Sequence, residues 1–321
     1  MRRYIFRRLL TAVFIILIVV ILNFTIIKTA PGDPARLMAG FDNPSEELIQ
    51  SITEKYGFDQ PFYIQIGRYF KSVIRGDLGD SYLYNQPVAR LIADRIGPSL
   101  LLSGVSIILA LIIGSLLGLY AGKNEGKLID KIFSTISYFL NSMPSFWIGI
   151  MLILLLASHF KWLPTQGMVN VRANYTGFRR VLDIATHMIL PVITLVSVQI
   201  PTYFRITKSA VMQVMAEDFI TTLRVAGMKE GAIFRKYVFK NAVLPIINVF
   251  SINLAYVVAG SMLVEIVFSW PGIGVLMYRS IMMRDYNVLM GVYLLISVSV
   301  VIVTILMDLV NAALDPRIRY E

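Results

Sequence analysis

Residues 96–122 read IGPSLLLSGVSIILALIIGSLLGLYAG, a stretch of 27 residues without Asp, Glu, Lys or Arg. An α-helix rises about 1.5 Å per residue, so roughly 20 residues cross the hydrocarbon core of a bilayer. A charged side chain at the centre of that core costs on the order of 3 kcal/mol, which explains why membrane-spanning segments avoid charge. The stretch therefore predicts a transmembrane helix.

Five more stretches of the chain share this pattern. They cover residues 9–27, 132–160, 184–204, 241–264 and 286–307, and each contains no Asp, Glu, Lys or Arg. Of all 321 residues, 56% are hydrophobic and only 16% are charged, and the mean hydropathy is +0.68. We therefore expect an all-α, polytopic membrane protein with six transmembrane helices.

The six stretches divide the chain into three parts. We expect residues 1–27 to form the cytoplasmic N-terminus and helix 1, residues 28–95 an extracytoplasmic segment, and residues 96–321 a core of helices 2–6 that includes loop 205–240. The first stretch is longer than the apolar core of about 7–15 residues in a signal peptide, so we expect it to be retained. No segment between the helices is long enough for a separate catalytic domain of ordinary size.

Lysine and arginine are distributed unevenly between the two sides of this topology. With six helices, both termini share one side with loops 123–131 and 205–240, and these segments hold 16 Lys and Arg in 67 residues. The segments on the other side hold 14 in 112 residues. The positive-inside rule therefore predicts that both termini are cytoplasmic. The net charge of +10 mainly reflects this topology, and because no dense basic tract occurs we expect no nucleic acid partner.

Several kinds of chemistry are excluded by the residues that the chain lacks. It has no cysteine, which rules out thiolate catalysis, disulfides and Cys-ligated metal centres. It has no GxxxxGK[ST] loop, so any ATP must bind another polypeptide. His159 and His187 have no cluster of further ligands nearby in the sequence. We therefore expect no catalytic residues, no metal site and no cofactor in this chain.

Polar side chains that cannot ionise interrupt three of the apolar stretches. Such residues either line a path for a polar solute or form hydrogen bonds between helices. Because ionisable residues are absent from the stretches, a proton relay through the membrane is disfavoured. Glu265 lies just beyond the fifth stretch, where a structural role and a place at the rim of a gate are equally plausible. The candidate pathway residues are Asn141, Ser142, Ser145, Gln199, Asn253 and Tyr256.

Loop 205–240 is the longest predicted cytoplasmic loop, and it contains no proline. Asp218 is predicted to cap a short helix from Phe219 to Ala226, which Gly227 ends in the left-handed conformation. A basic amphipathic helix is predicted to follow and to continue into the next transmembrane helix. A rigid helix–glycine–helix hairpin can transmit motion from a docked protein, although an ordinary structured loop has the same pattern.

The sequence from Glu217 to Pro245, EDFITTLRVAGMKEGAIFRKYVFKNAVLP, resembles the cytoplasmic loop of ABC importer permeases, in the form found in dipeptide/oligopeptide permease subunits. Thr221, Thr222 and Leu223 stand where the broader family has Glu-Ala-Ala, so the resemblance does not extend to a glutamate contact with the ATPase. Further matching pieces follow in order along nearly the whole chain: PGDP at 31, RGDLG at 75, PSFWIG at 144, VFSWPGIG at 267 and LDPRIR at 314.

The resemblance implies a type I ABC importer permease architecture in the cytoplasmic membrane of a bacterium or archaeon. It implies transport of di- or oligopeptides, or of similar small polar solutes. The implied partners are a second, related permease subunit, two ABC ATPase subunits that bind the ATP, and an extracytoplasmic solute-binding protein. ATPase coupling would then be carried by Asp218, Phe219, Ile220, Thr222, Leu223, Arg224, Ala226, Gly227 and Met228.

Two other classes of function are consistent with six apolar stretches. An ion- or proton-coupled carrier acting alone would take up solute in ATP-free liposomes under an ion gradient. A non-transporting membrane scaffold would show no solute flux in any reconstituted assembly. A P-loop ATPase that co-purifies with the chain would distinguish the importer from both.

Overall fold

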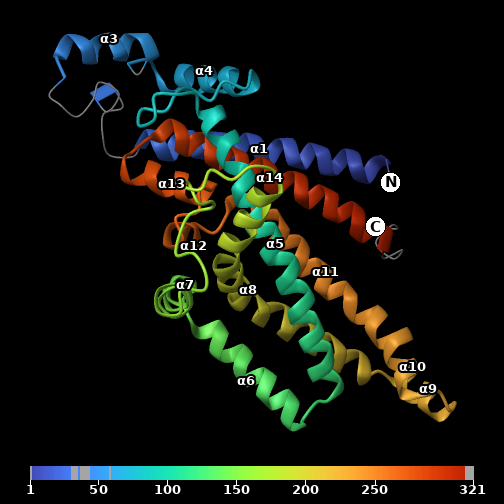
Figure 1. The fold of residues 1–321 in the computed structure, drawn as a ribbon. Coiled ribbons are helices and arrows are strands. Elements are labelled where there is room, and N and C mark those ends of the chain that lie inside the picture. The colour runs from blue at the N-terminus through green and yellow to red at the C-terminus, as the bar shows by residue number, and fades with distance from the viewer. Residues whose placement is uncertain (1, 30–34, 37–43, 58, 315–321) are drawn as a thin grey trace.

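The structure, a computed structural model, describes the chain except for residues 1, 30–34, 37–43, 58 and 315–321 (Figure 1). The described part is built from helices, and its only extended pairing is an isolated bridge between Asp80 and Pro87. The motif PGDP at 31 and most of LDPRIR at 314 lie outside the described residues. The prediction of an all-α fold is confirmed.

Four helical segments are long and apolar enough to cross a membrane. Each contains all or most of one of the charge-free stretches of the sequence, because a helix satisfies the backbone hydrogen bonds of an apolar segment within the segment itself. The segments are α5 (Val88–Lys123), α8 (Gly177–Met215), α14 (Tyr286–Leu314) and the stretch Glu230–Ala259, which comprises α10 (Glu230–Ile233), the π-helix η2 (Phe234–Val238), α11 (Phe239–Ala255) and the 3-10 helix η3 (Val257–Ala259).

The other two predicted spans are not single long apolar helices in the described residues. α1 (Arg2–Thr29) contains the apolar part Leu10–Ile26. A broken span consists of α6 (Leu128–Ser142), α7 (Ser145–Leu152) and the π-helix η1 (Ile153–His159), with a bend of 99° at the break. The break falls at Met143 and Pro144, because a residue before proline is driven out of the helical conformation, and Met143 has φ −89° and ψ 131°.

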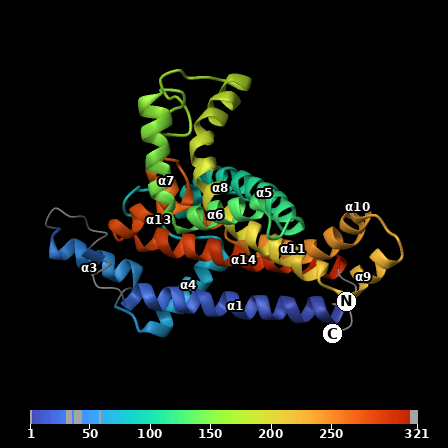
Figure 2. The same cartoon turned by 90° about the horizontal axis from the view of Figure 1, so that it is seen from below.

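The first and last helices pack side by side although they stand at opposite ends of the sequence (Figures 1 and 2). The side-chain amide of Asn23 in α1 donates a hydrogen bond to the carbonyl oxygen of Met290 in α14, at 3.1 Å. Nearer the start of α1, Arg8 forms an ion pair with Asp308. The beginning of α1 and the end of α14 therefore lie at the same end of the bundle.

The segment between α1 and α5 folds into two short helices, α3 (Glu46–Tyr56) and α4 (Phe62–Ile74). The hydroxyl oxygen of Ser45 accepts the N–H of Leu48 at 3.2 Å and so caps the start of α3. α4 packs on α1 through stacked rings of Phe24 and Tyr69, whose centroids are 5.5 Å apart. This segment lies at the end of the bundle opposite to the start of α1 (Figure 2).

α5 and α8 approach each other closely along a row of glycines in α5. Gly114, Gly118 and Gly122 are spaced by four residues, which places them on one face of the helix. A Cβ atom on Gly118 would lie 2.6 Å from the carbonyl oxygen of Phe204 in α8. The missing side chains therefore let the two backbones come together, as in other membrane helix pairs with small residues at this spacing.

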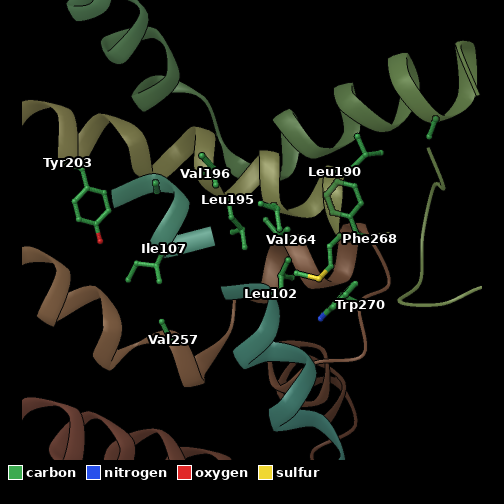
Figure 3. Packing of buried hydrophobic residues seen from close by; sticks show 14 of the residues in the cluster. Leu102, Ile107, Leu190, Leu195, Val196, Tyr203, Val257, Val264, Phe268 and Trp270 are labelled. Atoms are coloured by element: carbon green, nitrogen blue, oxygen red, sulfur yellow. The ribbon is translucent and has the colours of Figure 1, made fainter. Parts of the chain in front are cut away.

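The largest group of buried side chains lies where α5 and α8 meet the segment between α11 and α14 (Figure 3). That segment holds two short helices, α12 (Met262–Val267) and α13 (Ile273–Met282). Trp270, in the turn between them, is fully buried, and its indole N–H donates to the carbonyl oxygen of Pro98 in α5 at 2.9 Å. The cluster includes Leu102, Leu190, Val264 and Phe268. It ties α12 and its turn to the long helices.

Candidate coupling hairpin and translocation pathway

A short hairpin connects α8 to α10. α9 (Asp218–Val225) is followed by a reversal at Gly227, whose φ of +79° lies in the left-handed region that favours glycine. The N–H of Met228 donates to the carbonyl oxygen of Leu223 at 3.1 Å, and the N–H of Gly227 donates to that of Arg224 at 3.0 Å. These two bonds form a Schellman motif, so Gly227 ends the helix as predicted.

The predicted capping role of Asp218 is wrong. Glu217 occupies the N-cap position, where its backbone has the extended angles φ −70° and ψ 143°, and its side chain makes no capping hydrogen bond. Asp218 is the first helical residue, and its carboxylate still lies near the positive end of the helix dipole. The helix begins and ends one residue earlier than predicted.

One face of the hairpin packs on the ends of α8 and α11. Ile220 and Ile233 are fully buried, and they belong to a cluster with Val211 of α8 and Ala242 of α11. Leu223 and Met228 pack against the same cluster. Ile220, Leu223 and Met228 therefore fix the hairpin to the transmembrane helices.

The opposite face of the hairpin is open. Val225 was not among the predicted contact residues, yet its side chain is 85% exposed at the tip. The sequence signal that could have identified Val225 as a contact residue is its place two residues before Gly227, at the end of the predicted helix. An apolar side chain exposed to water at such a place often marks a surface that binds a partner. The predicted coupling residues that are exposed are Asp218, Phe219, Thr222, Arg224, Ala226 and Gly227.

An ion pair spans the turn of the hairpin. The Nε of Arg224 lies 2.7 Å from an Oε of Glu230, and both side chains remain partly exposed. Such a pair at the surface contributes at most about 1 kcal/mol. Together with the Schellman motif and the buried face, it holds α9 and α10 in one arrangement.

A cavity of about 260 Å³ lies between α5, α8 and α11. Three of the predicted pathway residues, Gln199, Asn253 and Tyr256, line it, although Gln199 and Asn253 are 54 positions apart in the sequence. The side-chain amide of Asn253 donates to the hydroxyl oxygen of the buried Tyr203 at 3.1 Å. Two serines outside the six candidates, Ser103 and Ser261, also line the cavity, and the remaining lining side chains are apolar.

The other three predicted pathway residues do not line this cavity. Asn141, Ser142 and Ser145 lie at the break between α6 and α7. The hydroxyl of Ser142 donates to the carbonyl oxygen of Tyr138 at 3.0 Å, which is a bond within its own helix. The structure thus separates the six candidates into a cavity group and a break group.

Glu265 sits on α12, close to Ser261 of the cavity wall, and its side chain is fully buried. One carboxylate oxygen accepts the hydroxyl of Ser99 at 2.7 Å, and the other accepts the N–H of Val275 at 3.1 Å. Burial raises the pKa of Glu265, and these hydrogen bonds oppose the increase. A Cβ atom on Gly272 would lie 2.4 Å from the carboxylate, so glycine makes room for it. Glu265 has a structural role in joining α12, α13 and α5.

Replacing Glu265 by leucine is expected to lower the free energy of unfolding by at least ~2 kcal/mol, because the Ser99 hydroxyl and the Val275 N–H lose a buried acceptor and each such loss costs about 1–3 kcal/mol. Thermal unfolding in detergent, followed by tryptophan fluorescence, measures this directly because Trp270 is buried in the same region. Glu47→Leu, on the exposed face of α3, is the control and is expected to unfold like the wild type. Equal unfolding temperatures for the two variants would contradict the role given to Glu265.

Within the described part of the chain, no three His, Asp or Glu side chains come together in a way that could hold a metal ion. The two candidate sites are a hairpin at one end of the bundle, formed by α9 and α10 (Figure 1), and the cavity lined by Gln199, Asn253 and Tyr256.

Residues 114–320 match the family described as the inner membrane component of binding-protein-dependent transport systems, and residues 1–103 match the N-terminal part of such membrane components. The chain belongs to this family. It is a multi-pass membrane permease, a transport subunit and not an enzyme. As the family description says, transport by such permeases depends on a separate binding protein.

Relatives of the permease extend over its full length. The oligopeptide transport system permease protein AppB of Bacillus subtilis is 36% identical over 321 residues, covering 100% of both chains. The probable peptide ABC transporter permease protein y4tP of Sinorhizobium fredii is 35% identical and covers 99% of both. The glutathione transport system permease protein GsiC of Salmonella paratyphi A is 33% identical over 321 residues, again with full coverage of both chains.

A solved structure has the same fold as the permease. A chain of the MetNI methionine ABC transporter, in an inward-facing conformation, superposes with a TM-score of 0.55 at 18% sequence identity. The match covers 70% of the permease and 96% of that chain. It confirms the predicted type I permease fold.

Proposed function

We propose that this permease carries peptides or similar small polar solutes into the cell as one subunit of an ATP-driven ABC importer. The observation that carries the proposal is the full-length identity of 36% with an oligopeptide permease. The cavity between α5, α8 and α11 supports the proposal, because the polar groups in its wall are amides and hydroxyls and none is charged. Such groups both donate and accept hydrogen bonds, as the peptide backbone requires.

The assembly that we propose contains a second permease subunit, two ATPase subunits and an extracytoplasmic solute-binding protein. The ATPases supply the nucleotide site, since this chain has no phosphate-binding loop. The hairpin, the start of α1 and the end of α14 lie at one end of the bundle (Figure 2). By the positive-inside rule, the excess of Lys and Arg favours a cytoplasmic location for that end.

In this assignment, residues 1–27 hold the cytoplasmic N-terminus and the first span, residues 28–95 the extracytoplasmic segment, and residues 96–321 the transport core with coupling loop 205–240. Closure of the ATPases displaces the hairpin, and the buried contacts of Ile220 and Ile233 pass the displacement to α8 and α11. Both helices also form walls of the cavity, so the same movement changes access to it.

Reconstitution into liposomes tests the function. Together with the ATPases and the binding protein, the permease is expected to accumulate a labelled oligopeptide only when ATP is present. Omitting any one component is expected to stop uptake. Uptake by the purified chain alone under a proton or sodium gradient would contradict the proposal and favour a secondary carrier. Absence of flux in every assembly would favour a scaffold.

Replacing Val225 by aspartate is expected to weaken ATPase binding by roughly five- to thirtyfold, the effect of losing about 1–2 kcal/mol at an interface residue. The reason is that Val225, at 85% exposure, is the most exposed large apolar side chain of the hairpin. Titration of purified ATPase subunits onto the permease in nanodiscs measures the affinity. Val225→Thr, which keeps the shape without adding charge, serves as the control. If aspartate and threonine behave alike, docking does not use the tip.

A further inference from the structure

The helix α6 is held in the bundle mainly by polar contacts. Among its residues, all of which the structure describes, only Asp130 and Ser137 are buried. None of its residues belongs to the three hydrophobic clusters of the described chain. Its large apolar side chains are mostly exposed, Tyr138 by 61%, and one ring contact joins Phe133 to Tyr120 of α5 at 6.3 Å. Apolar packing alone therefore does not account for the position of α6.

The buried carboxylate of Asp130 joins three parts of the chain. It forms an ion pair with the ammonium of Lys208 in α8. One of its oxygens accepts the backbone N–H of Gly126, in the turn between α5 and α6, at 3.1 Å, and the other accepts the hydroxyl of Ser134 at 3.2 Å. The ammonium of Lys208 also donates to the Ser134 hydroxyl oxygen, at 3.1 Å. The α5–α6 turn, α6 and α8 therefore meet at one group of residues, which we call the Asp130 junction: Gly126, Asp130, Ser134 and Lys208.

The ion pair of the junction contributes more to geometry than to stability. The side chain of Asp130 is 8% exposed and that of Lys208 is 21% exposed. Taking two charges out of water costs about as much as their attraction returns, so replacing a buried pair by apolar residues of similar volume is often neutral for stability. Charge-assisted hydrogen bonds are nevertheless short and depend strongly on direction. The Asp130 junction therefore fixes how α6 lies against α8.

Along α8, the junction lies between the coupling hairpin and the cavity. Lys208 is seven residues before Met215, where α8 ends, which corresponds to about 10 Å of helix. Val211, three residues beyond Lys208, belongs to the buried cluster on which the hairpin packs. Gln199, in the cavity wall, is nine residues before Lys208. A displacement of the hairpin along α8 therefore reaches the junction before it reaches the cavity.

Beyond the junction, α6 leads to another wall of the same cavity. At its far end the chain bends by 99° into α7. α7 lies against the end of α12, because a Cβ atom on Gly149 of α7 would be 3.0 Å from the ring of Phe268, the residue that follows α12. Ser261, just before the first residue of α12, lines the cavity. A movement of α6 can therefore reach the side of the cavity formed by Ser261.

We propose that the Asp130 junction makes α6 follow α8 when the hairpin is displaced, so that the movement reaches the cavity by two routes. One route is α8 itself, and the other passes through α6 and α7 to α12. Asp130 and Lys208 are positioning residues in this role, because neither lines the cavity. The inference rests on the proposed function, since it requires a hairpin that the ATPases displace. It adds the residues through which α6 joins the movement.

A covalent bridge tests whether α6 and α8 move together. Asp130→Cys with Lys208→Cys can be joined by a short bifunctional thiol reagent, and no other thiol of this chain competes because it has no cysteine. In liposomes with the ATPases and the binding protein, the unbridged variant is expected to transport about fivefold less solute per ATP hydrolysed than the wild type, the lower end of typical coupling between sites. The bridge is expected to restore most of this loss.

Two further variants separate the junction from the general effect of losing an ion pair. Asp130→Leu with Lys208→Met replaces the pair by apolar side chains, and we expect a normal yield of folded protein with the same loss of transport per ATP. Arg8→Met with Asp308→Leu is the matched control, because it removes the ion pair between α1 and α14 at the same end of the bundle. The control is expected to leave transport per ATP unchanged.

The inference is overturned if the bridge stops transport, because the pair would then have to open in each cycle. It is also overturned if the apolar variant transports as much solute per ATP as the wild type, or if the control loses as much as the apolar variant. Failure of the two cysteines to form a bridge in the purified permease would contradict the contact itself. Bridge formation is measured by mass spectrometry on the permease alone and needs no transport. A wild-type permease without ATP-driven uptake would therefore count against the proposed function and not against this contact.

Discussion

A permease in which valine replaces Gly118 is expected not to accumulate as a folded membrane protein. The added Cβ would lie 2.6 Å from the carbonyl oxygen of Phe204 and 2.7 Å from the Cβ of Thr207. The first of these is a backbone atom, so no side-chain rotation relieves the contact. α5 and α8 must move apart, and overpacking of this kind costs about 1–3 kcal/mol or more in a well-packed interior.

The consequence extends beyond one helix pair. α8 carries Lys208, whose ammonium pairs with the buried carboxylate of Asp130 at the start of α6. α8 also leads directly into the hairpin, and it contributes Gln199 to the cavity. Displacing α8 from α5 therefore disturbs the broken span that begins with α6, the hairpin and the cavity together.

The yield of monodisperse protein after size-exclusion chromatography measures the effect of the Gly118 substitution. Gly104→Val is the matched control, because Gly104 lies in the same helix and a Cβ there meets nothing within 4 Å. We expect the control to be recovered at the wild-type level and Gly118→Val at less than a tenth of it. Similar yields for the two variants would show that α5 and α8 do not depend on this close approach.

The positions of the apolar helices could be predicted from the sequence because exclusion of charge is a property of each stretch by itself. Their number agrees less well: six spans were predicted, and the described residues contain four long apolar helices, or five spans if the bent pair is counted as one. Every charge-free stretch is mainly helical in the structure, but stretch 132–160 is interrupted at Met143 and Pro144 and stretch 241–264 at Gly260 and Ser261. The glycine row at 114, 118 and 122 carries a visible signal as well, a small residue at every fourth position. That pattern predicts that another helix packs closely against this face, but it does not identify which helix.

The direction of the chain beyond the break within the third predicted span could not be predicted. Pro144 marks where the helix ends, since proline restricts the residue before it. It does not set the 99° bend, which depends on the packing of the chain beyond it: Ala157 of η1 and Met188 of α8 belong to one buried cluster. The same tertiary dependence left Asn141, Ser142 and Ser145 away from the cavity that Gln199 and Asn253 share.

The sequence of the hairpin predicted correctly that Gly227 ends helix α9, but not the residue in the capping position at its start. Gly227 was predictable because few other residues adopt a φ of +79°. Asp218 was predicted as the cap on residue preference, but the extended backbone at Glu217 starts the helix one residue earlier. The role of Glu265 was open because its partner Ser99 is 166 residues away, and only the fold brings the two together.

Replacing Gly227 by valine is expected to reduce solute-stimulated ATPase activity of the assembled transporter at least fivefold. Space is not the reason, because a Cβ on Gly227 meets nothing within 4 Å. The reason is the backbone: a β-branched residue in the left-handed region costs about 1–3 kcal/mol. A loss of that size changes the population of the native hairpin roughly 5- to 150-fold.

Two further substitutions separate conformation from side-chain size. Gly231→Val places the same side chain four residues away, in the helical part of the hairpin, where a Cβ also meets nothing within 4 Å. We expect it to retain stimulation, and we expect Gly227→Asn to retain most of it, because asparagine tolerates the left-handed conformation. If Gly227→Val keeps full stimulation, or if Gly231→Val loses as much, a rigid reversal at Gly227 is not what connects ATP hydrolysis to the transmembrane helices. Loss in Gly227→Val alone, with the ATPases still bound, places the defect in transmission through Ile220 and Ile233, because docking at the exposed tip is then intact.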